Sequence, residues 1–322
     1  MRTRAQAFGG SLARLAGTAL AWHLGMELVL LVGMALAGLA LFAGPVHAVE
    51  PADKYAAMPK STGLEWSTVT FKSTRDGADL NGWWFEGKPD APVLVMFDRS
   101  KGNMADLLPS VSQFVGRGFS VMTFDYRDFG PAGPGPVDSL IQLAYASRWV
   151  NDGEGALRFA RGKVGTRPVF AWGQDLGGAV AVAAGARDRK NADAISCEGL
   201  FRTLAELLRS NGLAQIPGVA DRNRFLVETS DEPLTAVGGL MVPLHVTIAM
   251  KDDVWPPAVT QDVVRNSLSR IDRWNVPDGK HLGLEKTPGY YDHMAAWYTR
   301  IAGMLKAATP APAAPEATAP GK

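Results

Sequence analysis

Cysteine and net charge are scarce in this chain of 322 residues. The single cysteine, Cys197, has no partner for an internal disulfide, so the fold does not depend on oxidising conditions. The 33 Lys and Arg residues nearly balance the 32 Asp and Glu residues, which leaves no strong field to attract nucleic acid. We therefore expect no nucleic-acid partner. The hydrophobic content of 47% is enough for the core of one α/β domain of about 200 to 250 residues.

A long apolar run lies near the N-terminus. An uncharged stretch over residues 28–49 follows three arginines, Arg2, Arg4 and Arg14, which is typical of an export signal or of a membrane anchor. The small residues that end the run predict cleavage after Ala48, whereas its length favours an uncleaved anchor, and both alternatives stay open. The arginines should stay in the cytoplasm in either case. We expect an exported protein, either periplasmic or anchored to the membrane and facing the extracytoplasmic side.

The composition divides the chain into three regions. Residues 1–50 form the signal peptide or anchor, and residues 51–306 form the folded domain. Residues 307–322 are rich in Pro and Ala and bury too little surface to order themselves, so we expect a disordered tail.

Short β-rich runs alternate with helix-length segments along the folded region. The first two runs, Ser67–Phe71 and Gly82–Phe85, flank an Asp76-Gly77 turn signal and predict an antiparallel pair. Continuous apolar runs suit parallel strands that are buried on both faces, and they lie at residues 92–97, 120–124, 169–172, 194–197 and 244–248, with a last strand around 273–276. The helix-length segments cover residues 103–117, 139–161, 177–187, 203–210, 257–267 and 290–305. The expected fold is a doubly wound α/β sheet, mostly parallel, with antiparallel first strands and no large cap domain.

A glycine-rich turn, Gly173-Gln174-Asp175-Leu176-Gly177, lies between a predicted strand and an Ala-rich helix. A sharp strand-to-helix turn exposes one side chain above the sheet and needs small residues on both sides. Glycines near helix starts also occur for packing alone, so the motif gains weight from chain order. Asp252 follows a later strand, and His281 follows the last one, as an acid and a histidine do in this type of site. We predict that Asp175, Asp252 and His281 meet at the carboxyl ends of the strands.

These stretches resemble a known superfamily. Residues 65–304 are similar to α/β hydrolases of the prolyl-oligopeptidase-like, serine aminopeptidase-like and dienelactone hydrolase-like branch. The resemblance lies in Val93–Phe97, Gly118–Arg127, Gly173–Gly178, Val254–Pro257 and Lys280-His281. It implies an oxyanion-loop region around four residues, Asp98, Arg99, Gln174 and Leu176.

The chain differs from these enzymes at the residues that would carry out catalysis. Such enzymes usually have serine at the elbow, where this chain has Asp175, and His-Gly in the oxyanion loop, where it has Asp98-Arg99. In haloalkane dehalogenases and epoxide hydrolases, which the arrangement also resembles, an elbow aspartate is the nucleophile. Asp175 would then attack an alkyl carbon, His281 would activate water, and Asp252 would orient the imidazole. Those families usually keep an oxyanion-loop glycine and a helical cap, which this chain lacks.

Two alternatives remain. In the first, the chain is an inactive hydrolase homologue that acts as a binding or scaffolding protein, and Arg99 pairs with Asp175. In the second, Asp98, Asp175, Asp252 and His281 together bind a divalent cation. No local metal-binding motif supports the cation, and we expect no cofactor. The first hypothesis is therefore an extracytoplasmic hydrolase with an Asp-His-Asp site that acts on an unidentified small molecule.

Overall fold

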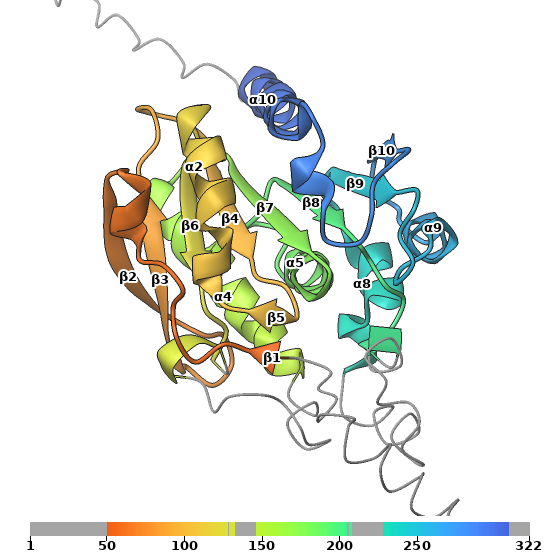
Figure 1. The fold of residues 1–322 in the computed structure, drawn as a ribbon, viewed down its shortest axis with the longest axis horizontal. Coiled ribbons are helices and arrows are strands. Elements are labelled where there is room, and N and C mark those ends of the chain that lie inside the picture. Colours follow the sequence, from red (N-terminus) through yellow and green to blue (C-terminus); the bar gives the residue numbers. More distant parts are fainter. Residues whose placement is uncertain (1–49, 128, 133–145, 205, 208–227, 309–322) are drawn as a thin grey trace, which may run out of the picture. The chain divides into compact units, whose positions relative to one another are not determined.

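Strands and helices alternate along the computed structural model, which describes residues 50–127, 129–132, 146–204, 206–207 and 228–308 (Figure 1). The predicted export segment over residues 1–49 and the tail over residues 309–322 lie outside the described residues. Within the described ranges, no helix is both long and apolar enough to span a bilayer.

One mixed sheet of eight strands organises the domain, in the order β10-β9-β8-β7-β4-β6-β3-β2. The pairs from β10 to β6 are parallel, and β3 pairs antiparallel with both β6 and β2. The strands are β2 Trp66–Lys72, β3 Asp79–Phe85, β4 Val93–Phe97, β6 Ser120–Phe124, β7 Val169–Gln174, β8 Ala194–Glu198, β9 Leu244–Ala249 and β10 Ile271–Val276. The predicted fold class is confirmed, since each expected strand is present. The carboxyl ends of β4, β7, β8, β9 and β10 share one edge of the sheet because these strands run parallel.

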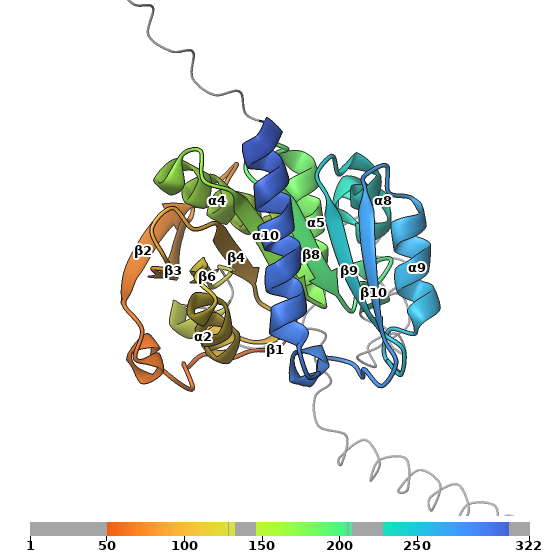
Figure 2. The same cartoon turned by 90° about the horizontal axis from the view of Figure 1, so that it is seen from above.

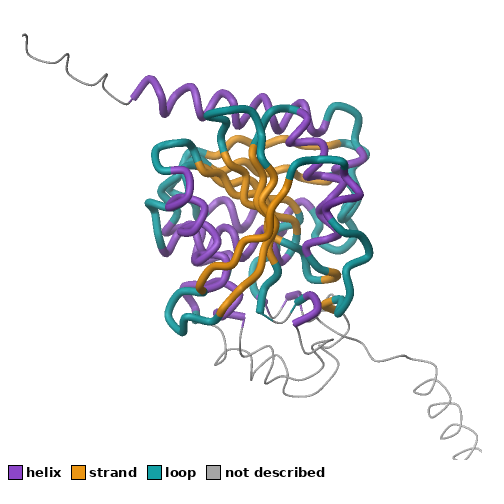
Figure 3. The backbone as a smooth tube through the Cα atoms, turned by 90° about the vertical axis from the view of Figure 1, so that its left-hand side faces the viewer, coloured by secondary structure: helices purple, strands orange, loops and turns teal. Residues whose placement is uncertain are grey.

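Helices cover both faces of the sheet (Figures 2 and 3). Helices α2 Leu108–Gly116 and α10 Tyr290–Ala308 pack on one face, and α4 Ala146–Val164, α5 Leu176–Arg187, α8 Pro233–Gly239 and α9 Pro257–Arg265 pack on the other. The short elements are β1 Glu50–Pro51, β5 Lys101–Gly102, η1 Pro59–Thr62, η2 Met104–Leu107, η3 Gly130–Ala132, η5 Thr229–Asp231 and η6 Leu284–Lys286. The sheet therefore separates two hydrophobic cores, one under each helix layer.

Most expected helices are present, with shifted ends. The segment predicted over residues 103–117 begins as η2 and continues as α2, which has a proline in its first turn. Helix α4 begins at Ala146, and the earlier part of the segment predicted from residue 139 lies outside the described residues, as does half of the helix predicted over residues 203–210. Helix α8 was not expected because seven residues are too few to show a helical period.

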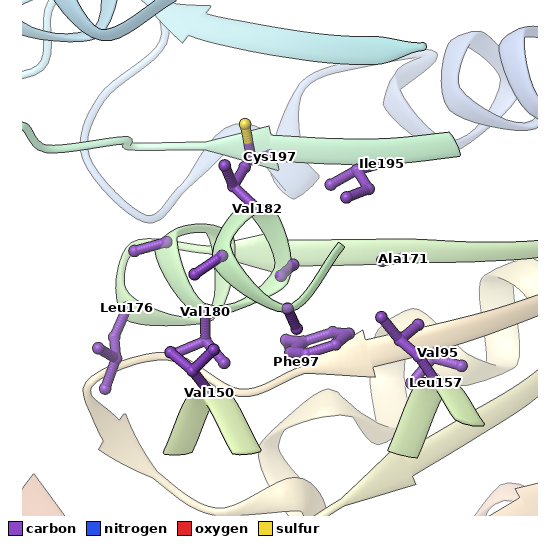
Figure 4. Packing of buried hydrophobic residues seen from close by; sticks show 14 of the residues in the cluster. Val95, Phe97, Val150, Leu157, Ala171, Leu176, Val180, Val182, Ile195 and Cys197 are labelled. Carbon is purple, nitrogen blue, oxygen red and sulfur yellow. The ribbon is translucent and has the colours of Figure 1, made fainter. Parts of the chain in front are cut away.

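The first turn of helix α5 approaches the end of β4 closely because its residues are small. Figure 4 shows Val182 beside Cys197 and Val180 beside Val150, so α5 packs both on the sheet and against α4, its neighbour on the same face. A Cβ on Gly177 would lie 2.3 Å from the backbone oxygen of Phe97. Only glycine permits this approach, which fixes the start of α5 against the end of β4.

Candidate functional site

Asp175 occupies the turn between β7 and α5 in a strained backbone conformation. Its φ of 51° and ψ of −120° lie in a region that residues with a side chain rarely adopt. A Cβ on Gly173 would lie 2.3 Å from the backbone carbon of Gly177, so the two glycines let the chain double back. The Asp175 N–H donates to the Glu198 carbonyl at 2.9 Å, which holds the turn against the end of β8. The geometry is that of a nucleophile elbow.

Two uncharged groups hold the Asp175 carboxylate. The Ser100 hydroxyl donates to Oδ2 at 2.5 Å, and the Trp255 indole N–H donates to Oδ1 at 2.9 Å. The residue is only 2% exposed. The first turn of α5 begins at the next residue, and its dipole favours a negative charge at this position. The hydrogen-bond partners of the Asp175 carboxylate in the described part of the chain are therefore neutral donors.

The predicted acid and histidine form a hydrogen-bonded pair. His281 Nδ1 donates to Asp252 Oδ2 at 3.1 Å, which leaves Nε2 as the nitrogen that can take up a proton. Burial lowers the pKa of His281, but the hydrogen bond and charge of Asp252, together with the charge of Asp175, outweigh it and raise the pKa above its ordinary value. The imidazole is thus oriented and made more basic by Asp252.

Backbone bonds fix the loop that carries Asp252. Asp252 Oδ1 accepts from the backbone N–H groups of Val254 at 2.9 Å and Trp255 at 2.7 Å. The Lys251 N–H donates to the Gly279 carbonyl at 2.9 Å, which joins this loop to the loop before His281. The acid and the histidine are therefore held by a connected framework.

Gly199 marks the point where the three segments converge. This residue follows β8 with a φ of 63°, and a Cβ placed on it would lie 3.7 Å from Asp175 N and 3.8 Å from His281 Cε1. The same point lies 3.5 Å from Trp255 Cδ1. Asp175, Trp255 and His281 thus surround one position at the carboxyl edge of the sheet.

The oxyanion-loop residues are placed differently from expectation. Asp98 is fully buried, its Oδ1 accepts from the Arg99 N–H at 2.9 Å, and its Oδ2 has no hydrogen-bond partner among the residues that the structure describes. Burial raises the pKa of Asp98 well above its ordinary value. The expected ion pair between Arg99 and Asp175 is wrong, because no salt bridge joins them in the described part of the chain and Asp175 is bonded elsewhere. Leu176 packs in the core.

Gln174 belongs to a buried polar cluster on the α10 side of the sheet. Its Nε2 donates to Glu198 Oε1 at 3.0 Å, and the Tyr290 hydroxyl donates to the same oxygen at 2.8 Å. Burial raises the pKa of Glu198 to about 7. Gln174 and Arg99 also line a cavity of about 510 Å³ beside the site. The two residues adjoin the elbow but do not contact the Asp175 carboxylate among the hydrogen bonds described.

Solved structures share this architecture. An esterase of Pyrococcus furiosus superposes with a TM-score of 0.61 at 15% identity and covers 80% of this chain and 97% of its own. An acetyl xylan esterase of a Paenibacillus species superposes with a TM-score of 0.54 at 15% identity, over 76% of this chain and 92% of its own. This chain has the α/β-hydrolase fold. No family model matches the sequence.

Two curated proteins resemble this hydrolase-like chain in sequence. Protein bem46 of Schizosaccharomyces pombe is 24% identical over 208 residues, which cover 62% of this chain and 64% of bem46. The α/β hydrolase domain-containing protein WAV2 of Arabidopsis thaliana is 22% identical over 246 residues, 71% of this chain and 76% of WAV2. The chain therefore spans less than two thirds of bem46, and the relatives support a hydrolase-like protein.

The hydrolase-like site contains two residues that sequence reasoning missed. Ser100 is the third residue after the strand that ends at Phe97, and it directly follows Asp98 and Arg99. Trp255 lies in a stretch that carries the resemblance, yet nothing in the sequence indicates that its indole reaches Asp175. Glu198 carried a signal, because it is a charged residue at the end of an otherwise uncharged buried strand.

The cation hypothesis finds no support in the hydrolase-like domain. Within the described ranges, no group of three or more His, Cys, Asp or Glu side chains is arranged to hold a metal ion. Asp98, one of the four proposed ligands, is fully buried, and one of its carboxylate oxygens accepts a hydrogen bond from the Arg99 amide.

Proposed function

We propose that the chain is a hydrolase in which Asp175 stands in place of the usual serine and forms a covalent ester with its substrate. One observation carries this proposal: a strained elbow holds the Asp175 carboxylate with neutral donors only, beside a paired Asp252 and His281. Backbone strain costs about 1 to 3 kcal/mol and clusters at active sites. A cation bound to Asp175 would reduce its nucleophilicity, and the described contacts include none.

The first step is a displacement at an alkyl carbon. An Asp175 carboxylate oxygen attacks a carbon that carries a leaving group, the new C–O bond forms, and the leaving group departs with its electron pair. The substrate class is therefore an alkyl halide or an epoxide. A halide ion leaves the first, whereas the ring oxygen of the second stays attached as an alkoxide and takes a proton from water.

The second step is hydrolysis of the ester. His281 Nε2 takes a proton from water, and the hydroxide adds to the Asp175 side-chain carbonyl. Asp252 holds the resulting imidazolium through the Nδ1 bond. When the tetrahedral centre collapses, the alcohol leaves with the proton from His281. Asp175 is released as a carboxylic acid, which loses its proton to solvent, so the regenerated carboxylate contains one oxygen from water.

Intact-mass measurement of the purified domain tests this chemistry. We expect an adduct with an alkyl halide or epoxide in the His281→Gln variant, which lacks the base for the second step. The Asp175→Asn variant should give none. Its amide side chain keeps an acceptor for Trp255 and offers a donor to Ser100, so this variant should fold normally and serve as the matched control. The proposal fails if neither adduct nor turnover is found with either class of electrophile.

Isotope labelling tests the same step independently. A single turnover of wild type in ¹⁸O-labelled water should place one labelled oxygen on Asp175, detected in the peptide that contains the elbow. Direct attack of water on the substrate would leave the peptide unlabelled and would exclude the covalent mechanism.

A second candidate function is ligand binding without turnover. The low exposure of Asp175 and the occupation of both its oxygens favour this alternative. It predicts that an Asp175→Ser variant keeps the stability of wild type and that electrophiles leave wild type unchanged. Turnover by wild type would remove it.

We propose that the domain acts outside the cytoplasm. The apolar run over residues 28–49 and the arginines before it support export. Cell fractionation and N-terminal sequencing of the mature protein distinguish the two forms. A mature N-terminus at Val49 indicates cleavage, an intact N-terminus in the membrane fraction indicates an anchor, and an intact protein in the cytoplasm contradicts export.

A further inference from the structure

We propose that the Trp255 indole N–H is the oxyanion donor of this site and replaces the backbone donor of the oxyanion loop. The assignment rests on the proposed aspartyl-ester chemistry. It gives Trp255 a catalytic role in ester hydrolysis, when the carbonyl oxygen of the ester becomes an oxyanion.

The oxyanion loop has lost a backbone donor. In the resembling hydrolases this loop lends a backbone N–H to the oxyanion, and here the Arg99 N–H is bonded to Asp98 Oδ1 at 2.9 Å. Asp98 is completely buried, so water does not compete for that bond. A group other than the Arg99 amide must therefore meet the charge that develops on the ester.

Trp255 has the geometry for this task. Its Nε1 lies 2.9 Å from Asp175 Oδ1, and the side chain is buried. The indole nitrogen can only donate, so the direction of this bond is fixed. The backbone N–H of Trp255 is bonded to Asp252, and its ring packs 5.1 Å from the ring of Phe201 between centroids. The donor is held in place before the reaction begins, which is the condition for electrostatic stabilisation.

The second donor identifies the oxygen that attacks. Ser100 Oγ donates to Oδ2, and a hydroxyl rotates about its Cβ–Oγ bond, whereas the indole cannot turn. Oδ2 is therefore the oxygen that can be released to form the bond to the substrate. Oδ1 stays on Trp255 and becomes the carbonyl oxygen of the ester.

A Trp255→Phe variant tests the assignment because it keeps an aromatic ring and removes the N–H. We expect adduct formation to change less than tenfold and adduct breakdown to slow by about 10²- to 10³-fold, as when an oxyanion donor is deleted elsewhere. The matched control is Trp297→Phe, which removes an indole bond of 2.8 Å to Asp272 away from the elbow. This control should leave both rates unchanged.

Infrared spectroscopy gives a readout that a purely structural role would not change. The adduct is trapped in the His281→Gln background, and the ester carbonyl stretch should move to higher frequency when Trp255→Phe is added. Wild-type breakdown rates in Trp255→Phe, or an unshifted carbonyl band, would overturn the assignment and leave the proposed function intact. Absence of any adduct in the His281→Gln background, with no turnover by wild type, would overturn both.

Discussion

A methyl group at Gly177 should disturb both the fold and the site. The Cβ of a Gly177→Ala variant would lie 2.3 Å from the Phe97 carbonyl oxygen and 2.5 Å from that of Asp98. Both are backbone atoms at the end of a buried strand and cannot rotate away. Ordinary contacts begin at 3.4 Å, so α5 and the end of β4 would have to separate by about 1 Å.

The structure gives a magnitude for this change. Overpacking of a well-packed interior costs about 1 to 3 kcal/mol. The shift also moves Asp175, the residue before the helix, relative to Ser100 in the oxyanion loop. A misplacement of about 1 Å can reduce a rate by about 100-fold. We therefore expect lower stability together with slower adduct formation.

Urea denaturation of Gly177→Ala beside Gly162→Ala measures the effect. Gly162 is exposed within α4, and a Cβ there meets nothing within 4 Å. The same substitution at Gly162 should therefore raise the free energy of unfolding by about 0.5 to 1 kcal/mol through helix propensity alone. If Gly177→Ala were as stable as wild type, the close approach of α5 to β4 would be refuted.

Three further predictions concern charged groups. The rate of adduct breakdown should rise with pH through a midpoint above 6.5, because only neutral His281 accepts a proton. The Asp252→Asn variant should have a lower midpoint in its pH–rate profile. An unchanged midpoint would contradict the pairing of Asp252 with His281. A Glu198→Gln variant should be more stable than wild type by about 3 kcal/mol above pH 8 and similar to it near pH 4. The reason is that a carboxyl whose pKa is raised from 4.5 to about 7 loses stability as pH rises through that window, so parallel pH dependences in chemical denaturation would exclude it. Arg127→Ala should cost about 3 to 5 kcal/mol in thermal and urea unfolding, because it leaves the fully buried Asp152 carboxylate without its cation; a loss below about 1 kcal/mol would contradict the importance of this ion pair.

The sequence predicted the elements whose signals are local. Continuous apolar runs identified the parallel strands because strands covered on both faces admit few polar residues. The glycines around Asp175 identified the elbow because a close approach excludes side chains. The order of Asp252 and His281 predicted that these two residues meet, and the structure shows them hydrogen-bonded.

Local sequence signals did not identify the side chains that hydrogen-bond to Asp175. Complementary charge suggested Arg99, but the direction of a side chain depends on loop dihedrals and on packing that a sequence does not encode locally. The chain instead brings Ser100 and Trp255 to the carboxylate, from positions 75 and 80 residues away. Asp98 turns into the core, where burial and not its neighbours dominates its protonation.

The hydrogen bonds that hold the Asp252 and His281 loops together should limit the motion of these loops. The N–H of Lys251 is bonded to Gly279, and those of Val254 and Trp255 are bonded to one carboxylate, so amides in these loops should exchange with deuterium as slowly as amides in strands. Loops that are already ordered lose little conformational entropy when a ligand arrives. A bound ligand would therefore meet a receptor that is rigid on the side of its acid and histidine.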